Sequence, residues 1–281
     1  MNAPRPFQRL DDRLAGKPLD DVLLAGVPDH LVTPLRDWIS EALQGNPDVS
    51  RRLSKAVVIS LGWPRHANTT YNGLLYNAPR EELLVVIDAI LQLTAEHPGV
   101  VEWDDVTDLD QYLRYGRSAY KVADNMLGLT SRVDPTMEGS FKEAVQAAEP
   151  TASKLLQQAW YHTYRPDPDP TTAYREAIRA VEQVACPLVL PSTDKATLGT
   201  VIAHLRQATT KWETVLIGAN ATPGGPEPVM ELMARLWTGQ VSRHGGSKNS
   251  RDQDQAEAEA AVHAAVLLVQ WLSTGTLRRK S

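Results

Sequence analysis

Cysteine is almost missing from this 281-residue sequence, in which Cys186 is the only one. A single cysteine cannot form a disulfide within the chain, and it cannot supply the several thiolates of a cysteine-based metal site. The seven histidines are scattered, and no two have the HxxxH or HExxH spacing that places two ligands on one helical face. We therefore expect a protein without a structural disulfide, without a metal and without another cofactor, in keeping with a cytoplasmic location.

Long apolar runs and an excess of positive charge are missing as well. The longest apolar run, near Ala264–Val269, is far too short to span a bilayer, and the N-terminal residues MNAPRPFQRLDDRLAG lack the apolar stretch of a secretory signal. No contact with a membrane is expected. The formal net charge of -5 provides no overall positive field, so nucleic acid would require a local basic patch. The sequence also contains no P-loop, no GxGxxG after a strand and no GxSxG, so no motif supports a small-molecule enzyme of these classes.

Apolar residues at helical spacing are abundant after the first 16 residues, which are polar and expected to be loosely held. Four helices with an apolar face are predicted in the first half: PDHLVTPLRDWISEAL (28–43), RRLSKAVVISLGW (51–63), PREELLVVIDAILQLT (79–94) and DLDQYLRYG (108–116). In the second half, helices are predicted over 138–163 (with a break at Pro150), 169–185, 195–206, 228–240 and 254–273. The stretch PLVLPST is expected to interrupt the helical pattern, and LRRKS to form a basic tail.

One segment departs from the helical period. Polar and apolar residues alternate over Ser118–Ala123 and again over Leu127–Val133, and Asp124-Asn125 between them suits a turn. This pattern predicts a small β-hairpin at about residues 118–133. The predicted fold class is therefore all-α, with helical bundles and this one hairpin. We expect two domains: an N-terminal helical region over residues 1–134 that ends in the hairpin, and a helical bundle over residues 136–281.

The clearest candidate for chemistry is QVSRHGGSKNS, residues 240–250, between the last two predicted helices. Arg243 is permanently cationic and suited to bind a phosphate through two parallel hydrogen bonds, while His244 can exchange a proton near neutral pH. The two glycines that follow allow close approach of the backbone, and Arg235 would add positive charge. These are the groups that cleavage of RNA by its own 2'-hydroxyl requires. The alternative is a helix end, where Arg and His complement the helix dipole and glycine forms the cap.

Three further groups have both a functional and a structural interpretation. WYHTYR, residues 160–165, contains His162, which could join His244 across the bundle, or the aromatic rings simply cover the end of a helix. The segment Glu176–Glu182 has acidic and basic residues three positions apart, as on a solvated helix face. The stretch Trp63–Tyr71 is polar and aromatic, which suits either a loop that binds a partner or an ordinary surface loop.

Four stretches in the second half follow one another in a characteristic order: an early helix, a middle helix containing TLG, an Arg/His-Gly junction and a closing helix. They are AYREAIRAVEQVACPLVLP, ATLGTVIAHL, ELMARLWTGQVSRHGG and AEAAVHAAVLLVQWL. In this order they resemble the C-terminal domain of bacterial abortive-infection (Abi-type) proteins, which belong to the HEPN-like helical bundles. The resemblance covers roughly residues 155–273.

The resemblance implies a protein of phage defence that cleaves RNA at a composite site where two bundles meet in a homodimer. In active members an Arg is followed four to six residues later by a His. The present sequence departs from this pattern, because His244 is preceded directly by Arg243 and, nine positions earlier, by Arg235. Either these residues form a variant site, or the bundle is a non-catalytic module that binds RNA or a protein.

The leading hypothesis is an intracellular phage-defence or abortive-infection protein that cleaves RNA without a metal. In this hypothesis Arg243 binds the phosphate, His244 performs the acid–base chemistry and Arg235 assists. The expected partners are an RNA substrate and a second copy of the chain in a symmetric dimer. The alternative is a non-enzymatic interaction or sensor protein, for example a toxin's partner, which the acidic net charge and the missing Arg–His spacing favour.

Overall fold

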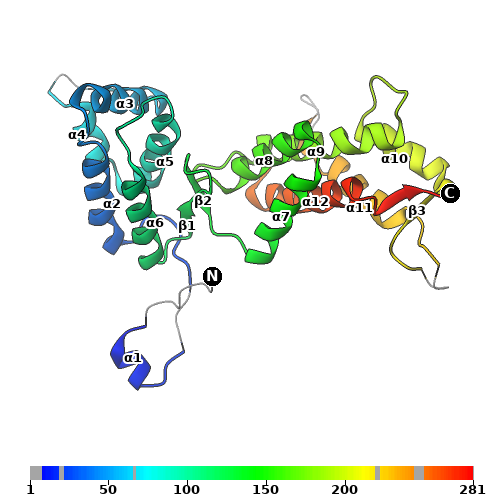
Figure 1. Cartoon of the computed structure of the whole chain (residues 1–281), viewed down its shortest axis with the longest axis horizontal. Coiled ribbons are helices and arrows are strands. Elements are labelled where there is room, and N and C mark those ends of the chain that lie inside the picture. The colour runs from blue at the N-terminus through cyan, green and yellow to red at the C-terminus, as the bar shows by residue number, and fades with distance from the viewer. Residues whose placement is uncertain (1–7, 19–21, 66–67, 219–221, 244–249, 281) are drawn as a thin grey trace. The chain divides into compact units, whose positions relative to one another are not determined.

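The computed structural model describes residues 8–18, 22–65, 68–218, 222–243 and 250–280 (Figure 1). The chain divides into two compact units, each described by itself below. The N-terminal unit comprises Met1–Arg132 with Arg165–Asp167, and the C-terminal unit comprises Val133–Tyr164 and Pro168–Ser281. In the described residues helices predominate, and the strands form two small antiparallel pairs. The predicted fold class, all-α with one small β-hairpin, is confirmed, and the second strand pair is a feature that the sequence analysis did not predict.

The N-terminal unit is a group of amphipathic helices around one apolar core. Its elements are α1 (Leu10–Leu14), α2 (Asp29–Ala42), α3 (Pro47–Ser60), α4 (Tyr71–Tyr76), the 3₁₀ turn η1 (Arg80–Glu82), α5 (Leu83–Thr94), α6 (Trp103–Tyr115), β1 (Tyr120–Val122) and β2 (Leu129–Ser131). Helix α2 packs against α4, α5 and α6, and α3 packs against α4 and α5. The core therefore lies between α2, α3 and α5, the helices whose apolar period is clearest in the sequence.

The fully buried Trp38 joins α2 to α6. Its indole Nε1 donates a hydrogen bond to the carbonyl oxygen of Asp105, with 2.6 Å between the two atoms. At the same helix start, Glu102 and Asp105 form a capping box, in which each side chain accepts a hydrogen bond from the other residue's backbone N–H. Packing and capping together fix the beginning of α6, where Trp103 points its ring into solvent.

Two short helices in this unit were not predicted. Helix α1 lies in the polar segment that was expected to be loosely held, and none of its residues is buried. Helix α4 begins at Tyr71, where the sequence indicated only a loop, and the Thr70 hydroxyl caps it by accepting from the Gly73 N–H at 3.0 Å. Helices of five or six residues are too short to show an apolar period, which explains both omissions.

The hairpin predicted at about residues 118–133 is confirmed: β1 and β2 pair antiparallel, with Val122 opposite Leu129. Asp88 on α5 holds it. This buried carboxylate accepts the Leu129 N–H at 2.7 Å and the Gln92 amide at 2.5 Å. Gly128, with a φ of 152°, permits this approach, because a Cβ there would lie 2.7 Å from the Asp88 Oδ1.

The C-terminal unit is a helical bundle with a small sheet. Its elements are α7 (Pro135–Ala147), α8 (Pro150–Tyr164), α9 (Pro170–Val189), α10 (Leu198–Gln207), the 3₁₀ turn η2 (Thr209–Lys211), β3 (Trp212–Thr214), α11 (Glu227–Thr238), the 3₁₀ turn η3 (Val241–Arg243), α12 (Gln255–Ser273) and β4 (Leu277–Arg279). Helix α9 packs against α8, α10 and α12, while α12 also packs against α7, α8 and α11. These two long helices therefore form the centre of the bundle.

One prediction for this unit holds with a shifted boundary, and another is wrong. PLVLPST does interrupt the helical pattern, but α9 continues through Pro187 and ends at Val189. A proline in the last turn removes only one helical hydrogen bond, and burial of Val189 favours continuation. The expected basic tail instead forms β4, which pairs antiparallel with β3 and buries Leu277. The Arg279 guanidinium lies 5.4 Å from the centre of the Trp212 ring.

The cysteine on α9 is half-buried. Burial raises the pKa of the Cys186 thiol to about 11, and the carboxylate of Glu182 acts in the same direction. The side chain is therefore a protonated thiol at neutral pH, and its nucleophilicity is low. In the described part of the chain, no helix combines the length and apolar character that crossing a membrane would need.

Candidate functional site

Four helix ends meet at one end of the C-terminal unit, where α8 and α11 end and α9 and α12 begin. The Gln253 N–H donates to the Thr171 hydroxyl at 3.0 Å, which joins the start of α12 to the start of α9. The Gln255 side chain donates to the Thr163 carbonyl at 2.9 Å, which joins α12 to the last turn of α8. The Tyr174 hydroxyl donates to the Leu236 carbonyl at 3.0 Å, which joins α9 to α11. We call this region the loop end of the unit.

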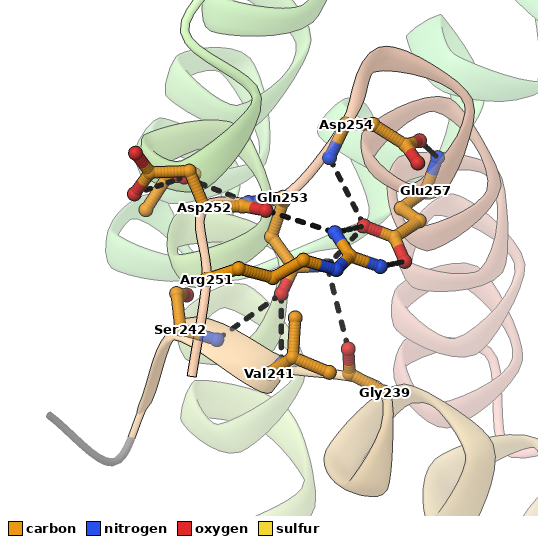
Figure 2. Close-up of polar contacts among 9 residues, drawn as sticks. Gly239, Val241, Ser242, Arg251, Asp252, Gln253, Asp254 and Glu257 are labelled. Carbon is orange, nitrogen blue, oxygen red and sulfur yellow. Dashed lines mark hydrogen bonds and ion pairs between the residues drawn. The ribbon is translucent and has the colours of Figure 1, made fainter. Parts of the chain in front are cut away.

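Gln253 ties together the two sides of the segment that follows α11 (Figure 2). Its side chain is buried, and its Oε1 accepts the N–H of Val241 at 2.8 Å and that of Ser242 at 3.3 Å. Its Nε2 donates to the Gly239 carbonyl at 3.3 Å and to the Glu257 carboxylate at 3.1 Å. One amide side chain thus uses both its donor and its acceptor to hold the segment's two ends together.

The start of α12 forms a second set of polar contacts beside Gln253. The Arg251 guanidinium donates two hydrogen bonds to the Glu257 carboxylate, at 2.8 and 2.5 Å. These bonds lower the pKa of Glu257 and raise that of Arg251. Asp254 caps the helix by accepting from the Glu257 N–H at 2.9 Å, and its own N–H donates to the Glu257 carboxylate at 3.0 Å. The two carboxylates also complement the positive end of the helix dipole.

The predicted site residues lie at or beside the loop end. Arg235 is in the last turn of α11, where its largely exposed guanidinium pairs with Glu231 at 2.8 Å. Arg243 is the last residue of η3, and His244 lies outside the described residues. Helix α11 ends before the RHGG sequence, because Gly239 occupies its C-terminal cap. The roles assigned to Arg235, Arg243 and His244 therefore stay predictions.

The structure brings together a polar group that sequence reasoning missed. The Tyr164 hydroxyl on α8 lies 2.7 Å from Nε2 of His263 on α12. Burial raises the pKa of Tyr164, with the Glu259 carboxylate adding to the effect, and burial lowers the pKa of His263. The hydrogen bond therefore joins a protonated phenol to a neutral imidazole. A histidine within the Ala- and Val-rich sequence AVHAAV, four residues after Glu259, was the available signal.

The acidic residues of the segment Glu176–Glu182 make contacts that stabilise the fold. The Glu176 carboxylate is nearly buried, where it accepts from Arg179 at 2.7 Å and from Arg175 at 3.0 Å. The expected i,i+3 pair is present, but its acid is not on a solvated face, because Glu176 belongs to the buried side of α9. Glu182 instead accepts the Leu198 N–H at 2.8 Å at the start of α10.

The segment WYHTYR lies at the end of α8, where the His162 carbonyl accepts the Asp169 N–H at 2.9 Å and the Trp160 ring stacks on Phe141, with 4.1 Å between the ring centres. The other sequence candidate is described only in part. In the stretch Trp63–Tyr71, the Arg65 guanidinium lies 5.0 Å from the centre of the Tyr71 ring. His66, in the same stretch, lies outside the described residues.

Gly239 is required where α11 meets α9. A Cβ at this position would lie 2.3 Å from the Tyr174 Oη and 3.0 Å from the Arg235 carbonyl oxygen. We expect Gly239→Ala to push the tyrosine off the Leu236 carbonyl and to lower the free energy of unfolding by about 1–2 kcal/mol. Chemical denaturation of the full chain measures this loss. Tyr174→Phe in the alanine background tests the cause, because the clash should be relieved once the hydroxyl is gone; an equal loss in both variants would contradict it.

Among the described residues, no group of three or more His, Cys, Asp or Glu side chains is placed to hold a metal ion. A comparison with protein-family models found no match to the chain, and no similar protein was found among the curated proteins or the solved structures. The candidate site therefore rests on the chain's own residues.

Proposed function

We propose that the C-terminal unit acts on RNA in defence against phage, and that the segment between α11 and α12 is its RNA-binding and RNA-cleaving element. The observation that carries this proposal is the set of contacts made by Gln253, which holds the two sides of that segment at the loop end. A segment with fixed ends loses less conformational entropy on binding than a free one, so its side chains bind a ligand more tightly.

The positive charge of this segment favours binding of an anionic ligand. From Gln240 to Arg251 the sequence contains Arg243, Lys248 and Arg251 and no carboxylate. Arg251 is bound by Glu257, and we assign the contacts to the RNA backbone to Arg243 and Lys248. Such a local basic patch is what a protein of formal net charge -5 needs in order to bind a polyphosphate.

The proposed reaction is transfer of the phosphodiester to the neighbouring 2'-hydroxyl. His244 takes the proton from the attacking 2'-oxygen, and Arg243 stabilises the charge that develops on the phosphate oxygens. The bond to the 5'-oxygen breaks, and that oxygen receives a proton from the same histidine of a second copy in a symmetric dimer. The products are a 2',3'-cyclic phosphate and a free 5'-hydroxyl. Arg235 assists by adding charge near the loop, and no metal takes part.

The test compares four full-length proteins on a labelled single-stranded RNA in the presence of EDTA: wild type, His244→Ala, Arg243→Ala and Lys154→Ala. We expect His244→Ala to reduce the cleavage rate by about 100-fold or more while RNA binding persists. Arg243→Ala should weaken binding and lower its dependence on salt. Lys154 is an exposed residue of α8, and its replacement is the matched control for loss of one positive charge. Unchanged cleavage by His244→Ala would show that the histidine is not catalytic.

The alternative function is a non-catalytic module that binds a protein or RNA partner. The observation in its favour is the pairing of Arg235 with Glu231 on the exposed side of α11, which neutralises a cation assigned to the site. In this case the wild-type protein would protect the host against phage while total RNA stays intact. Equal protection by His244→Ala and Arg243→Ala would support binding over catalysis.

A further inference from the structure

An open cleft of about 640 Å³ lies in the N-terminal unit, between α6 and the hairpin. One face of α6 forms its first wall, with Trp103, Val106, Asp110 and Arg114 among the lining residues. The end of β1 and the turn that follows form the other wall, which includes Val122, Asp124 and Met126. All the residues that line the cleft belong to this unit.

The cleft exposes two large apolar side chains. Trp103 is 66% exposed although indole is among the side chains that gain most from burial. On the opposite wall Met126 is 37% exposed and has a φ of 60°, a backbone conformation that residues other than glycine rarely adopt. The turn is held in this form by the Met126 N–H, which donates to the Ala123 carbonyl at 2.8 Å. An exposed aromatic and an exposed thioether facing one cleft are typical of a surface that contacts a partner.

The surroundings of the cleft are acidic. The sequence from Glu102 to Asp110 contains five carboxylates and no basic residue. Asp110 and Asp124 line the cleft from opposite walls, and Arg114, whose guanidinium lies 4.9 Å from the centre of the Tyr115 ring, is the basic residue among those that line it. Burial raises the pKa of Tyr112 on α6, and carboxylates on α6 and α2 raise it further. A polyphosphate such as RNA would be repelled here.

We propose that this cleft binds a basic, extended peptide segment of a partner protein. A Lys or Arg side chain of the peptide lies across the exposed face of Trp103, where it gains a cation–π contact. A second basic residue pairs with Asp110, and an apolar residue between the two basic ones contacts Met126 and Val106. Arg114, at the other end of the cleft, fixes the direction of the peptide by repelling its basic residues toward Trp103.

The length of the cleft sets the length of the peptide. Trp103 and Arg114 are eleven residues apart on one helix, which corresponds to about 16 Å along the helix axis. An extended chain rises about 3.3 Å per residue, so about five peptide residues fill the cleft. The proposal concerns the N-terminal unit and does not depend on the RNA-directed activity of the C-terminal unit.

The test measures binding of fluorescein-labelled peptides to the full-length protein by fluorescence anisotropy. The probes are a peptide with the central sequence KLRKL, its acidic counterpart ELEEL, and a labelled single-stranded RNA. We expect the basic peptide to bind and both anionic probes to fail at the cleft. Trp103→Ala should lower the affinity for the basic peptide at least about 10-fold. Asp110→Asn retains an oxygen that can accept the Val122 N–H, and it should lower this affinity about fivefold and make it less dependent on salt.

Two matched control variants test whether the loss of peptide binding is specific to the cleft. Tyr76→Ala removes another exposed aromatic ring, and Glu81→Gln removes another exposed carboxylate, both from the same unit but away from the cleft. Neither should change the affinity by more than about twofold. Circular dichroism of every variant checks that the unit is folded. Equal binding of the basic peptide by Trp103→Ala and wild type, or equal binding of the acidic and the basic peptide by the wild type, would overturn the proposal.

Discussion

Replacing Gln253 with alanine is expected to lower the free energy of unfolding of the C-terminal unit by roughly 1–3 kcal/mol. The variant removes the acceptor of the Ser242 N–H, while the Val241 N–H and the Gly239 carbonyl lose Gln253 but keep the hydrogen bond of 2.9 Å between them. Each buried polar group that loses its hydrogen bond costs about 1–3 kcal/mol, which accounts for the size of the effect. Because the same side chain holds both ends of the candidate loop, RNA binding should weaken in parallel.

Hydrogen exchange of the Val241 and Ser242 amides is the most direct measurement, since these are the groups that Gln253 protects. Chemical denaturation gives the global free energy. Gln270→Ala is the matched control, because this exposed amide of α12 makes a single side-chain contact, to Glu143 at 2.9 Å. Unchanged amide exchange in Gln253→Ala would show that the loop end does not depend on this residue.

Replacing Asp88 should release the hairpin in a way that depends on pH. Asp88→Ala removes the acceptor of the Leu129 N–H and is expected to cost roughly 2–3 kcal/mol at pH 7.5. Asp88→Asn keeps an acceptor oxygen and removes the buried charge. Burial raises the pKa of Asp88 above 3.8, against the opposing effects of its hydrogen bonds and of Arg165, while Asp167 adds to the rise.

The sign of the pH effect follows from this shift. A carboxyl whose folded-state pKa is raised stabilises the fold below its unfolded pKa, and that stabilisation is lost as the pH rises through the folded-state pKa. The free energy of unfolding of Asp88→Asn should therefore exceed that of the wild type at pH 7.5, and the difference should shrink toward pH 4. Denaturation at both pH values, with amide exchange of residues 120–131, measures it. A difference that grows toward pH 4 would show that the ionised form is the one the fold prefers.

Apolar periodicity was sufficient to predict most helices and the hairpin. Helices α2, α5 and α12 contain enough buried residues at helical spacing for the period to be recognised in a single sequence. Strand β4 could not be predicted in this way, because Leu277 is buried only by pairing with the distant β3. The exact end of α9 was not predictable either, because the helix continues past Pro187 as far as the buried Val189.

The candidate site was predictable only in its position. The sequence QVSRHGGSKNS marks a basic, glycine-containing connection, but it does not indicate that Gln253 would bind both of its sides. It likewise gives no sign that Tyr164 and His263, almost a hundred residues apart, lie within hydrogen-bond distance. Such pairs depend on which helices become neighbours, and a local pattern contains no information about that.

The protonated thiol on α9 provides a built-in reporter of local opening. With a pKa of about 11, the folded Cys186 has about one thiolate in ten thousand molecules at pH 7, whereas an exposed thiol has about three in a hundred. The thiolate is the form that attacks an alkylating reagent, so the native chain should react about 300 times more slowly than the opened one. The alkylation rate therefore measures how often α9 opens around Cys186. A second cysteine placed on an exposed helix would react with a dye while Cys186 stays unmodified.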